Sequence, residues 1–548
     1  MNESTTATEK TSTQTTVARS TAVMSAATTL SRVTGFVRTW ATALALGASA
    51  AASAYTTANN VPNMIFELVA GGVLSSLFIP TFMDVQKRRG QQAAWAFACH
   101  IMTICLVALG VVAIVGTILP QPFMWTQYFL GGRAGAATDE VRQLANFFFR
   151  FFALQVIFYG VGMVMQALLN ARRQYLWTSL GPVFNNLVVI GFMLVAARLP
   201  LTDGTYRLLA LGTTAGVAVM FAVMVPSLAR TGFRWKFELG LRDPDVRAML
   251  RLAVPTVVYV VTNLVAVSIR NAAAGAISAG AQAQVAYANI WSNLPYGILA
   301  VSVATATFTE LSDAATSRDH SGFKRSFVSG LRTTVILMLP ASALLFSLAR
   351  PLIALYVGGR MSTADAAPIT HILQVWAVTL VFYAGMMYVI RSFYSLKDTR
   401  TVAISNLWCT LVQVAGYLFL TGSVIAAAPV FGVAGIPAAD GIFYVAQFVV
   451  LLLFLRRRIG SFDLRGLIAC FVRMAVISVV VGAVVWFLVA WLTPVFGSGR
   501  AAALGVVVVA GIVGLALTIA AGYLFGISEV TGLLNRLVVR LRRRGQSV

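Results

Sequence analysis

Two arginines lie inside the first long apolar stretch of the chain, in the run SRVTGFVR at residues 31–38. The flanking residues 21–30 and 39–49 carry no charge. A cation at membrane depth costs several kcal/mol unless it faces a partner or a water-filled cavity. Arginine presents a planar fork of donors that suits phosphate oxygens, so Arg32 and Arg38 predict a cavity that holds an anion. Two alternatives stay open: the side chains extend to the interface, or they pair with Glu67.

Further polar residues in apolar stretches extend this candidate binding site. Glu67 is expected to pair with an arginine, or else to bind a proton or a cation. Arg270 lies near the outer end of its stretch, where it either adds a cation to the cavity or extends to the interface. Four asparagines either line the cavity or form hydrogen bonds between helices: Asn60, Asn63, Asn289 and Asn293.

The composition identifies a multi-pass membrane protein. The 548 residues are 58% hydrophobic and 11% charged, with a mean hydropathy of +0.82, whereas soluble domains are about one-quarter charged. A net charge of +23 would suggest nucleic acid binding in a soluble protein. Here the basic residues cluster in short loops, so membrane topology explains them better and no nucleic acid partner is expected.

The sequence contains no pattern typical of an enzyme active site. It has no Gly-rich phosphate loop ending in Lys-Ser or Lys-Thr. The three histidines, His100, His320 and His371, are scattered, and the four cysteines lie in apolar segments without metal-like or disulfide-like spacing. We therefore expect a transporter with no catalytic residues and no metal site or cofactor.

Apolar windows long enough to cross about 30 Å of hydrocarbon recur along the whole chain. They predict an all-α fold with about fourteen transmembrane helices. The predicted spans are residues 18–46, 54–85, 92–119, 142–169, 176–198, 207–229, 246–276, 282–312, 326–357, 369–394, 401–422, 433–455, 466–491 and 502–526.

The charges of the connecting loops alternate and test this count. Loops after odd-numbered spans are nearly uncharged, as at 47–52, 278–282 and 426–432. Loops after even-numbered spans are basic, as at 87–89, 172–173, 230–242, 318–325, 397–400 and 456–465. Because basic loops stay in the cytoplasm, the alternation predicts an even count and two cytoplasmic termini.

A repeated motif divides the predicted spans into two lobes. The second span contains Asn60-Val61-Pro62-Asn63 and the eighth contains Asn293-Leu294-Pro295-Tyr296, each preceded by Ala-Tyr. Six spans separate the copies, which is typical of parallel repeats with a binding site between two lobes. The predicted organisation is a disordered cytoplasmic tail (1–16), a first lobe (17–230), a basic cytoplasmic linker (231–245), a second lobe (246–458), a two-span appendage (459–530) and a basic cytoplasmic tail (531–548).

The run at 31–38 resembles the first-helix motif of the MurJ/MviN family, the lipid II flippases of peptidoglycan synthesis. The resemblance continues in family order from Ala18 to Arg457. It is carried by VPN at 61–63, GGVLS at 71–75, FIP at 78–80, QVIFYG at 155–160, LNAR at 169–172, PVFNN at 182–186, PYGI at 295–298 and RSFYSLKDT at 391–399.

The resemblance implies a fold similar to that of the multidrug and oligosaccharidyl-lipid exporter (MOP) superfamily. Two MATE-like lobes of six helices would enclose a cationic cavity, and the last two spans would form a groove for a lipid tail. The implied function is movement of undecaprenyl-pyrophosphate-linked peptidoglycan precursor, lipid II, from the inner to the outer leaflet by alternating access. The family's cavity arginines match Arg32 and Arg38, and Asn406 lies where the family can place a sodium ligand. The expected coupling is to sodium or to the membrane potential.

Three positions depart from the family pattern. The family commonly has an acidic residue at Ser53, a basic one near Glu67 and an arginine at Asn289. An actinobacterial-looking branch of the family shares part of this pattern, and Arg270 is a candidate replacement for the missing cation. The departures leave the lipid-linked substrate open.

Other functions also fit parts of the sequence. One is a related flippase for another polyprenyl-linked glycan, and a second is a drug exporter, which the paired arginines disfavour. A third is a non-transporting membrane scaffold for cell-wall synthesis, which would act through the basic loops and tail. The expected location is the bacterial cytoplasmic membrane, and the expected partners are lipid II, anionic membrane lipids and cell-wall synthesis proteins.

Overall fold

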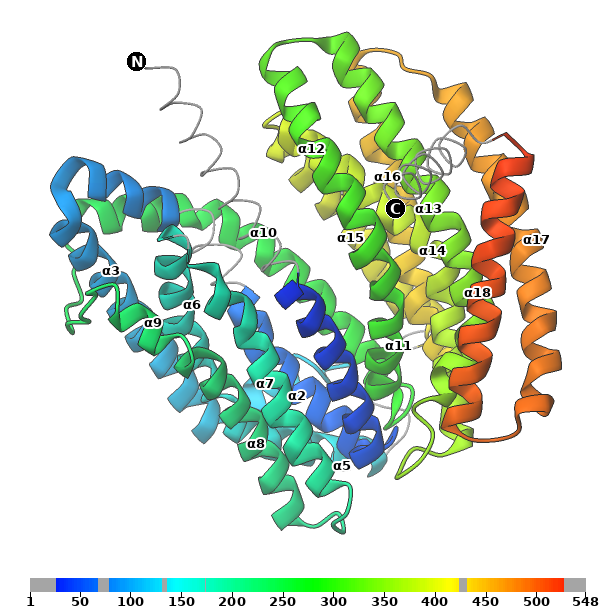
Figure 1. Cartoon of the computed structure of the whole chain (residues 1–548). Helices are drawn as coiled ribbons and strands as arrows, with labels where there is room; N and C mark the ends of the chain where they lie inside the picture. Colours follow the sequence, from blue (N-terminus) through cyan, green and yellow to red (C-terminus); the bar gives the residue numbers. More distant parts are fainter. Residues whose placement is uncertain (1–25, 68–77, 131–135, 173, 423–430, 527–548) are drawn as a thin grey trace, which may run out of the picture. The chain divides into compact units, whose positions relative to one another are not determined.

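The structure is a computed structural model that describes residues 26–67, 78–130, 136–172, 174–422 and 431–526 (Figure 1). The described chain is all-helical, with one isolated β-bridge between Gly358 and Met361. The predicted tails at 1–16 and 531–548 and the GGVLS motif at 71–75 lie outside the described residues. The prediction of an all-α membrane protein is confirmed.

Ten described helices are long and apolar enough to cross a membrane. The count becomes eleven if α5 (Ala136–Phe152) and α6 (Gln155–Ala171), which meet at a bend of 41°, are one span. Helices also occupy the predicted first, second and seventh spans, as residues 26–46, α2 (Ala50–Glu67) and α10 (Pro244–Gly275). The exact count of fourteen stays a prediction.

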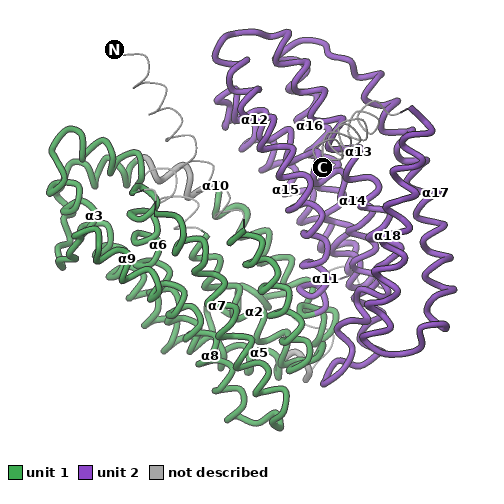
Figure 2. The backbone as a smooth tube through the Cα atoms, in the orientation of Figure 1, with its two compact units in different colours: residues 1–283 green, residues 284–548 purple. Residues whose placement is uncertain are grey.

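The chain divides into two compact units, residues 1–283 and 284–548 (Figure 2). The division falls within α11 (Ala281–Pro295), so α10 belongs to the first unit. The sequence predicted that α10 belongs to the second lobe. The predicted lobe boundaries stay a prediction.

The first unit is built around α3 (Ile79–Ile118), α6 and α8 (Asp203–Ala222). The long helix α3 changes direction at Gly90, where φ is 85°, a conformation that only glycine adopts without strain. This break follows the predicted cytoplasmic loop 87–89. At the centre of the unit, Phe221 lies so close to Gly162 that a Cβ there would come within 2.0 Å of the ring. The remaining helices of the unit are α4 (Pro120–Trp125), α7 (Tyr175–Ala196) and α9 (Val225–Ala229).

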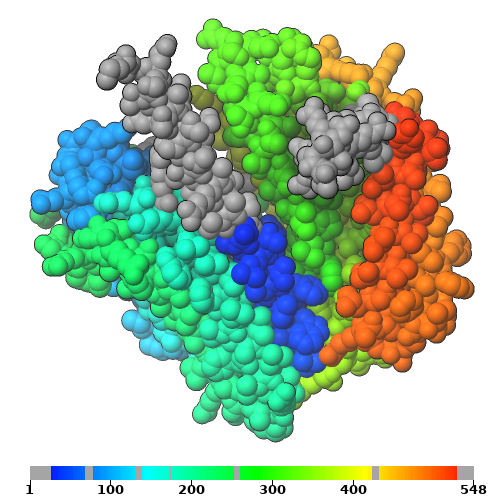
Figure 3. Space-filling model, in the orientation of Figure 1, coloured from blue at the N-terminus to red at the C-terminus, as the bar shows by residue number. Residues whose placement is uncertain are grey.

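The second unit packs around α13 (His320–Ala354) and α14 (Thr363–Ser395). Helix α16 (Gly435–Ile459) lies against α14 and α15 (Thr399–Leu420), while α17 (Leu464–Phe496) lies against α13. Helix α18 (Arg500–Leu524) packs on α17 and α13 and shows its outer face in Figure 3, in red. The two last predicted spans therefore pack onto α13.

A π-helical turn interrupts the span that contains the second copy of the repeat. Pro295 ends α11, and the π-helical turn η2 (Tyr296–Ala300) leads into α12 (Val301–Thr316). Proline lacks the amide donor that a continuous helix needs, and this accounts for a break here. The matching Pro62 stays inside α2.

An ion-pair cluster fixes the N-terminal part of α3 to the start of α10. The Asp245 carboxylate accepts from Arg88 at 2.9 Å and from Arg89 at 2.8 Å, and Arg88 also pairs with Asp84 at 2.7 Å. The hydrogen bond from Arg88, supported by Arg89, lowers the pKa of Asp245 below its ordinary value.

We expect Asp245→Asn to destabilise the protein at pH 7 by up to about 1 kcal/mol, because both arginines are half exposed. A lowered pKa in the folded state means that this stabilisation is present above the pKa of the unfolded chain. It is lost as the pH falls through the folded-state pKa. Thermal unfolding in detergent, measured from pH 7 to pH 3, should show the difference from wild type shrinking toward zero. A difference that is constant across this range would contradict the ion-pair explanation.

Candidate binding site of the first unit

The N-terminal helix (residues 26–46) carries Arg32 and Arg38 and is held to α7 by a buried amide. Asn186 donates from Nδ2 to the Ser31 carbonyl at 3.3 Å and to Thr34 Oγ1 at 3.1 Å. The helix is visible in dark blue at the surface of the first unit in Figure 3. These contacts hold the helix in place on both sides of Arg32.

Arg32 is exposed and lines a pocket of about 590 Å³ within the first unit. Thr178 donates to Asn170 Oδ1 at 3.1 Å across one wall, which leaves the Asn170 amide nitrogen available as a donor. The lining residues come from the N-terminal helix, α3, α6 and α7: Thr28, Ser31, Arg32, Ile79, Gln166, Asn170, Tyr175, Thr178, Ser179 and Pro182. One cation among neutral hydroxyl and amide groups suits an anion that also carries hydrogen-bonding groups.

Arg38 lies at a different place on the same helix. It is half-buried and close enough to the Tyr159 hydroxyl for an electrostatic interaction. Tyr159 donates to Asn63 Oδ1 at 2.9 Å, and Asn63 donates from Nδ2 to the Asn59 carbonyl at 2.8 Å. The structure thus brings Arg38 and Asn63 together through Tyr159, whereas Arg38 is not among the residues that line the Arg32 pocket.

The other predicted residues of α2 lie on either side of Asn63. Asn60 is half-buried, and Glu67 is exposed at the last residue of α2. Among the ion pairs of the described residues, none joins Glu67 to Arg32 or Arg38. A role of Glu67 in binding stays a prediction.

Arg270 lies on α10 in the first unit, and its Nε atom is buried with no hydrogen-bond partner among the described residues. Asn289 belongs to the second unit and accepts from Asn293 Nδ2 at 2.8 Å on its own helix. Asn406 is buried on α15, also in the second unit. The predicted site residues are therefore divided between the two units.

A buried network fixes the helix end next to Arg270. Gln282 Oε1 accepts from Thr57 at 2.7 Å and from Tyr128 at 2.9 Å, and Gln282 Nε2 donates to the Asn271 carbonyl at 2.8 Å. Asn271 in turn donates to Gln127 Oε1 at 2.8 Å. Both acceptor and donor groups of Gln282 are satisfied, which is what a buried amide requires.

Ser53, one of the departures from the family pattern, has a structural role. It is fully buried, and its hydroxyl accepts from the Ala283 amide at 3.3 Å. Ala283 lies in the first turn of α11, where backbone amides have no partner within the helix. A carboxylate at position 53 would meet the same amide, so the serine preserves the contact without the charge.

A buried carboxylate in the second unit is not among the residues predicted from the sequence. Asp440 on α16 is 2% exposed and accepts from Trp376 Nε1 at 3.0 Å, from Gln413 Nε2 at 2.8 Å and from the Tyr417 hydroxyl. No ion pair involves it among the described residues. The available signal was a single acidic residue in an otherwise uncharged span, which commonly marks a functional or tightly bonded group.

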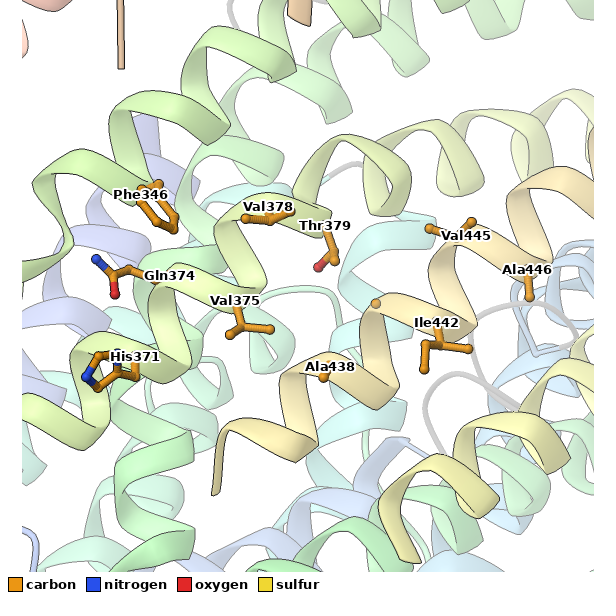
Figure 4. A pocket seen from close by; sticks show the side chains of 11 residues that line it. Phe346, His371, Gln374, Val375, Val378, Thr379, Ala438, Ile442, Val445 and Ala446 are labelled. Atoms are coloured by element: carbon orange, nitrogen blue, oxygen red, sulfur yellow. The ribbon is translucent and has the colours of Figure 1, made fainter. Parts of the chain in front are cut away.

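Two apolar pockets of the second unit share Phe346 and Val378. The first, of about 710 Å³, lies between α14 and α16, and Figure 4 shows His371 and Gln374 together on its α14 side. The second, of about 480 Å³, is lined by α13 and α17, including Trp486 and Phe487. Pockets with such an apolar lining suit a hydrocarbon chain and not a charged head group.

The model of the family described as "Lipid II flippase MurJ" matches residues 42–526. The chain belongs to this family. The match covers most of the chain and confirms the family predicted from the sequence motifs, although it begins after Arg38. The branch of the MurJ family stays a prediction.

Relatives and solved structures agree with membership of the MurJ family. A lipid II flippase MurJ of Burkholderia cenocepacia is 26% identical over 440 residues, covering 79% of this chain and 82% of that protein. A probable lipid II flippase MurJ of a Synechocystis species is 26% identical over 467 residues, covering 81% and 82%.

Among solved structures, a lipid II flippase MurJ in an inward closed conformation has a TM-score of 0.76 and 20% identity. It covers 92% of this chain and 99% of its own. An inward-facing MATE transporter of the MOP superfamily has a TM-score of 0.64 and 16% identity, covering 79% and 94%. These likenesses confirm the predicted MATE-like fold.

Proposed function

We propose that this chain is a flippase that moves lipid II, the undecaprenyl-pyrophosphate-linked peptidoglycan precursor, from the inner to the outer leaflet by alternating access. The observation that carries the proposal is the pocket around Arg32 in a multi-pass member of the MurJ family. A guanidinium and several neutral donors suit a pyrophosphate, and the pocket offers both. The apolar pockets of the second unit supply a surface on which a polyprenyl tail remains in a hydrocarbon environment.

The proposed location is the bacterial cytoplasmic membrane with both termini in the cytoplasm, supported by the alternation of basic and uncharged loops. The proposed partners besides lipid II are anionic membrane lipids and proteins of cell-wall synthesis. The chain is proposed to act as a transporter without catalytic residues.

Depleting the protein in its host should leave lipid II in the inner leaflet, as measured by an assay of leaflet access. If lipid II still reached the outer leaflet at the normal rate, in cells without a second flippase, the proposal would be wrong. Adding other polyprenyl-linked glycans to the same assay tests the related substrates.

The energy source is proposed to be sodium or the membrane potential. Asn406 is the sodium candidate, and the intramembrane cations Arg32 and Arg38 are the groups on which a potential would act. Repeating the leaflet assay without sodium, and then with the potential collapsed, separates the two sources.

A further inference from the structure

The segment between α9 and α10 is extended and alternates apolar with charged residues. The sequence FRWKFELGLR covers residues 233–242 and forms neither helix nor ladder in the structure. In an extended chain, successive side chains point to opposite sides. Four of its five large apolar side chains are exposed: Trp235 is 46% exposed, Phe237 62%, Leu239 42% and Leu241 54%. We call residues 232–242 the strap.

The strap is bound along one side of α3 through its backbone. Thr103 Oγ1 accepts from the Glu238 amide and from Trp235 Nε1, both at 3.3 Å. The Lys236 amide donates to Cys99 Sγ at 3.4 Å. Phe233 is buried against Trp95, with ring centroids 6.4 Å apart. These contacts span two turns of α3.

The position on α3 indicates that the strap lies at one edge of the hydrocarbon, which the alternation of loop charges predicts to be the cytoplasmic edge. Thr103 is fully buried beneath the strap, and the next residues on the same helix face are Val107, Val111, Ile114 and Ile118, which are 38% to 67% exposed. This exposed stripe is the lipid-facing side of the span. A helix needs about 20 residues to cross the hydrocarbon. If the crossing ends at Leu119, it begins near Cys99. The strap is bonded at this boundary.

The basic and acidic side chains of the strap differ in their contacts. Arg234, Lys236 and Arg242 are exposed. Its acidic residue Glu238 and the adjoining Asp243 both face His100, at 3.5 and 3.6 Å. Although the Glu238 side chain remains 52% exposed, the three exposed basic side chains outnumber it, so the strap presents a net positive charge to an external anion.

We propose that the strap is a membrane-surface site for anionic phospholipid of the cytoplasmic leaflet. Trp235, Phe237, Leu239 and Leu241 enter the boundary between head groups and acyl chains, while Arg234, Lys236 and Arg242 bind the lipid phosphates. Aromatic residues and basic residues are the pair of groups that favour this boundary. The strap lies at the level where the exposed apolar stripe of α3 ends. A lipid-binding site must lie at this level, whereas a protein-binding site need not. The site is independent of the substrate that the chain carries.

Amide hydrogen exchange of the full chain in nanodiscs tests the proposal. One disc contains phosphatidylcholine alone, and the other is an equal mixture with phosphatidylglycerol. We expect the strap amides to exchange on the order of a hundredfold more slowly in the mixture, since each of the three basic residues contributes about a factor of five at an anionic surface. The variant Arg234→Gln/Lys236→Gln should lose most of this difference and keep only the contribution of Arg242.

The matched control is Arg456→Gln/Arg457→Gln, which removes two exposed charges from the end of α16. It should keep the slow exchange of the strap. Equal exchange in both discs, or protection that survives the strap substitutions, would overturn the proposal. Protection that depends on protein concentration and not on phosphatidylglycerol would assign the surface to a second copy of the chain and would also overturn it.

Discussion

Arg32→Glu should abolish complementation in cells depleted of the native protein. Arg32 is the one cation among the described residues that line its pocket. A hydrogen bond to a charged group contributes about 1.5–3 kcal/mol, so Arg32→Gln alone should slow flipping on the order of tenfold to a hundredfold. A reversed charge adds repulsion of the pyrophosphate to this loss. Arg32→Lys keeps the charge but not the planar fork, so its activity should fall between those of wild type and Arg32→Gln.

The matched control is Arg198→Glu, which reverses an exposed arginine outside the pocket. It should support growth at the same level of protein in the membrane. Growth of the Arg32→Glu strain at normal expression would remove this residue from the mechanism, whereas loss of growth with both variants would point to a general effect of negative charge.

Asp440→Leu should be the most destabilising single change in the second unit. It removes the acceptor of two buried donors, on Trp376 and Tyr417, and of the half-buried Gln413 amide, which keeps its second bond to the Tyr417 hydroxyl at 2.8 Å. Each unsatisfied donor costs about 1–3 kcal/mol, and the membrane-embedded reference state reduces these costs toward the lower value. With two donors left unsatisfied, we therefore expect a loss of about 2–4 kcal/mol and a thermal midpoint lower by several degrees in detergent.

Asp440→Asn separates hydrogen bonding from charge. It retains one acceptor oxygen but places an amide opposite a donor, so its loss should be smaller than that of Asp440→Leu. Asp139→Leu is the control, because that carboxylate is 68% exposed and pairs only with an exposed arginine. A thermal midpoint of Asp440→Leu equal to that of the control would show that the three bonds contribute nothing to stability.

The fold could be predicted because it depends on features that one sequence displays. Apolar windows and loop charges follow from the bilayer itself, so they indicate a multi-pass helical chain without knowledge of its contacts. The site depends on pairings that local patterns do not contain. Asp440 meets partners 23, 27 and 64 residues away in the chain, and its identity as a buried acceptor became clear only from those contacts.

The two arginines show a second limit of sequence patterns. Their closeness in the run at 31–38 suggested one shared cavity. Six residues of helix turn the direction of a side chain by about 240°, so Arg32 and Arg38 point to different neighbours. The structure gives Arg32 a polar pocket and places Arg38 beside Tyr159. Similarly, equivalent positions of the repeat have different neighbours. Asn63 accepts from Tyr159, whereas its counterpart Tyr296 packs on Tyr383 with ring centroids 4.5 Å apart.

The π-helical turn after Pro295 sets the orientation of everything that follows it in its span. A π turn holds about one residue more than an α turn, and one residue corresponds to about 100° of rotation. The 16 residues of α12 therefore present a different set of side chains to their neighbours than an unbroken continuation of α11 would. The extra residue of the π turn thus rotates α12 about its axis. This rotation decides which side chains of α12 pack on α13 and α14 and which face outward.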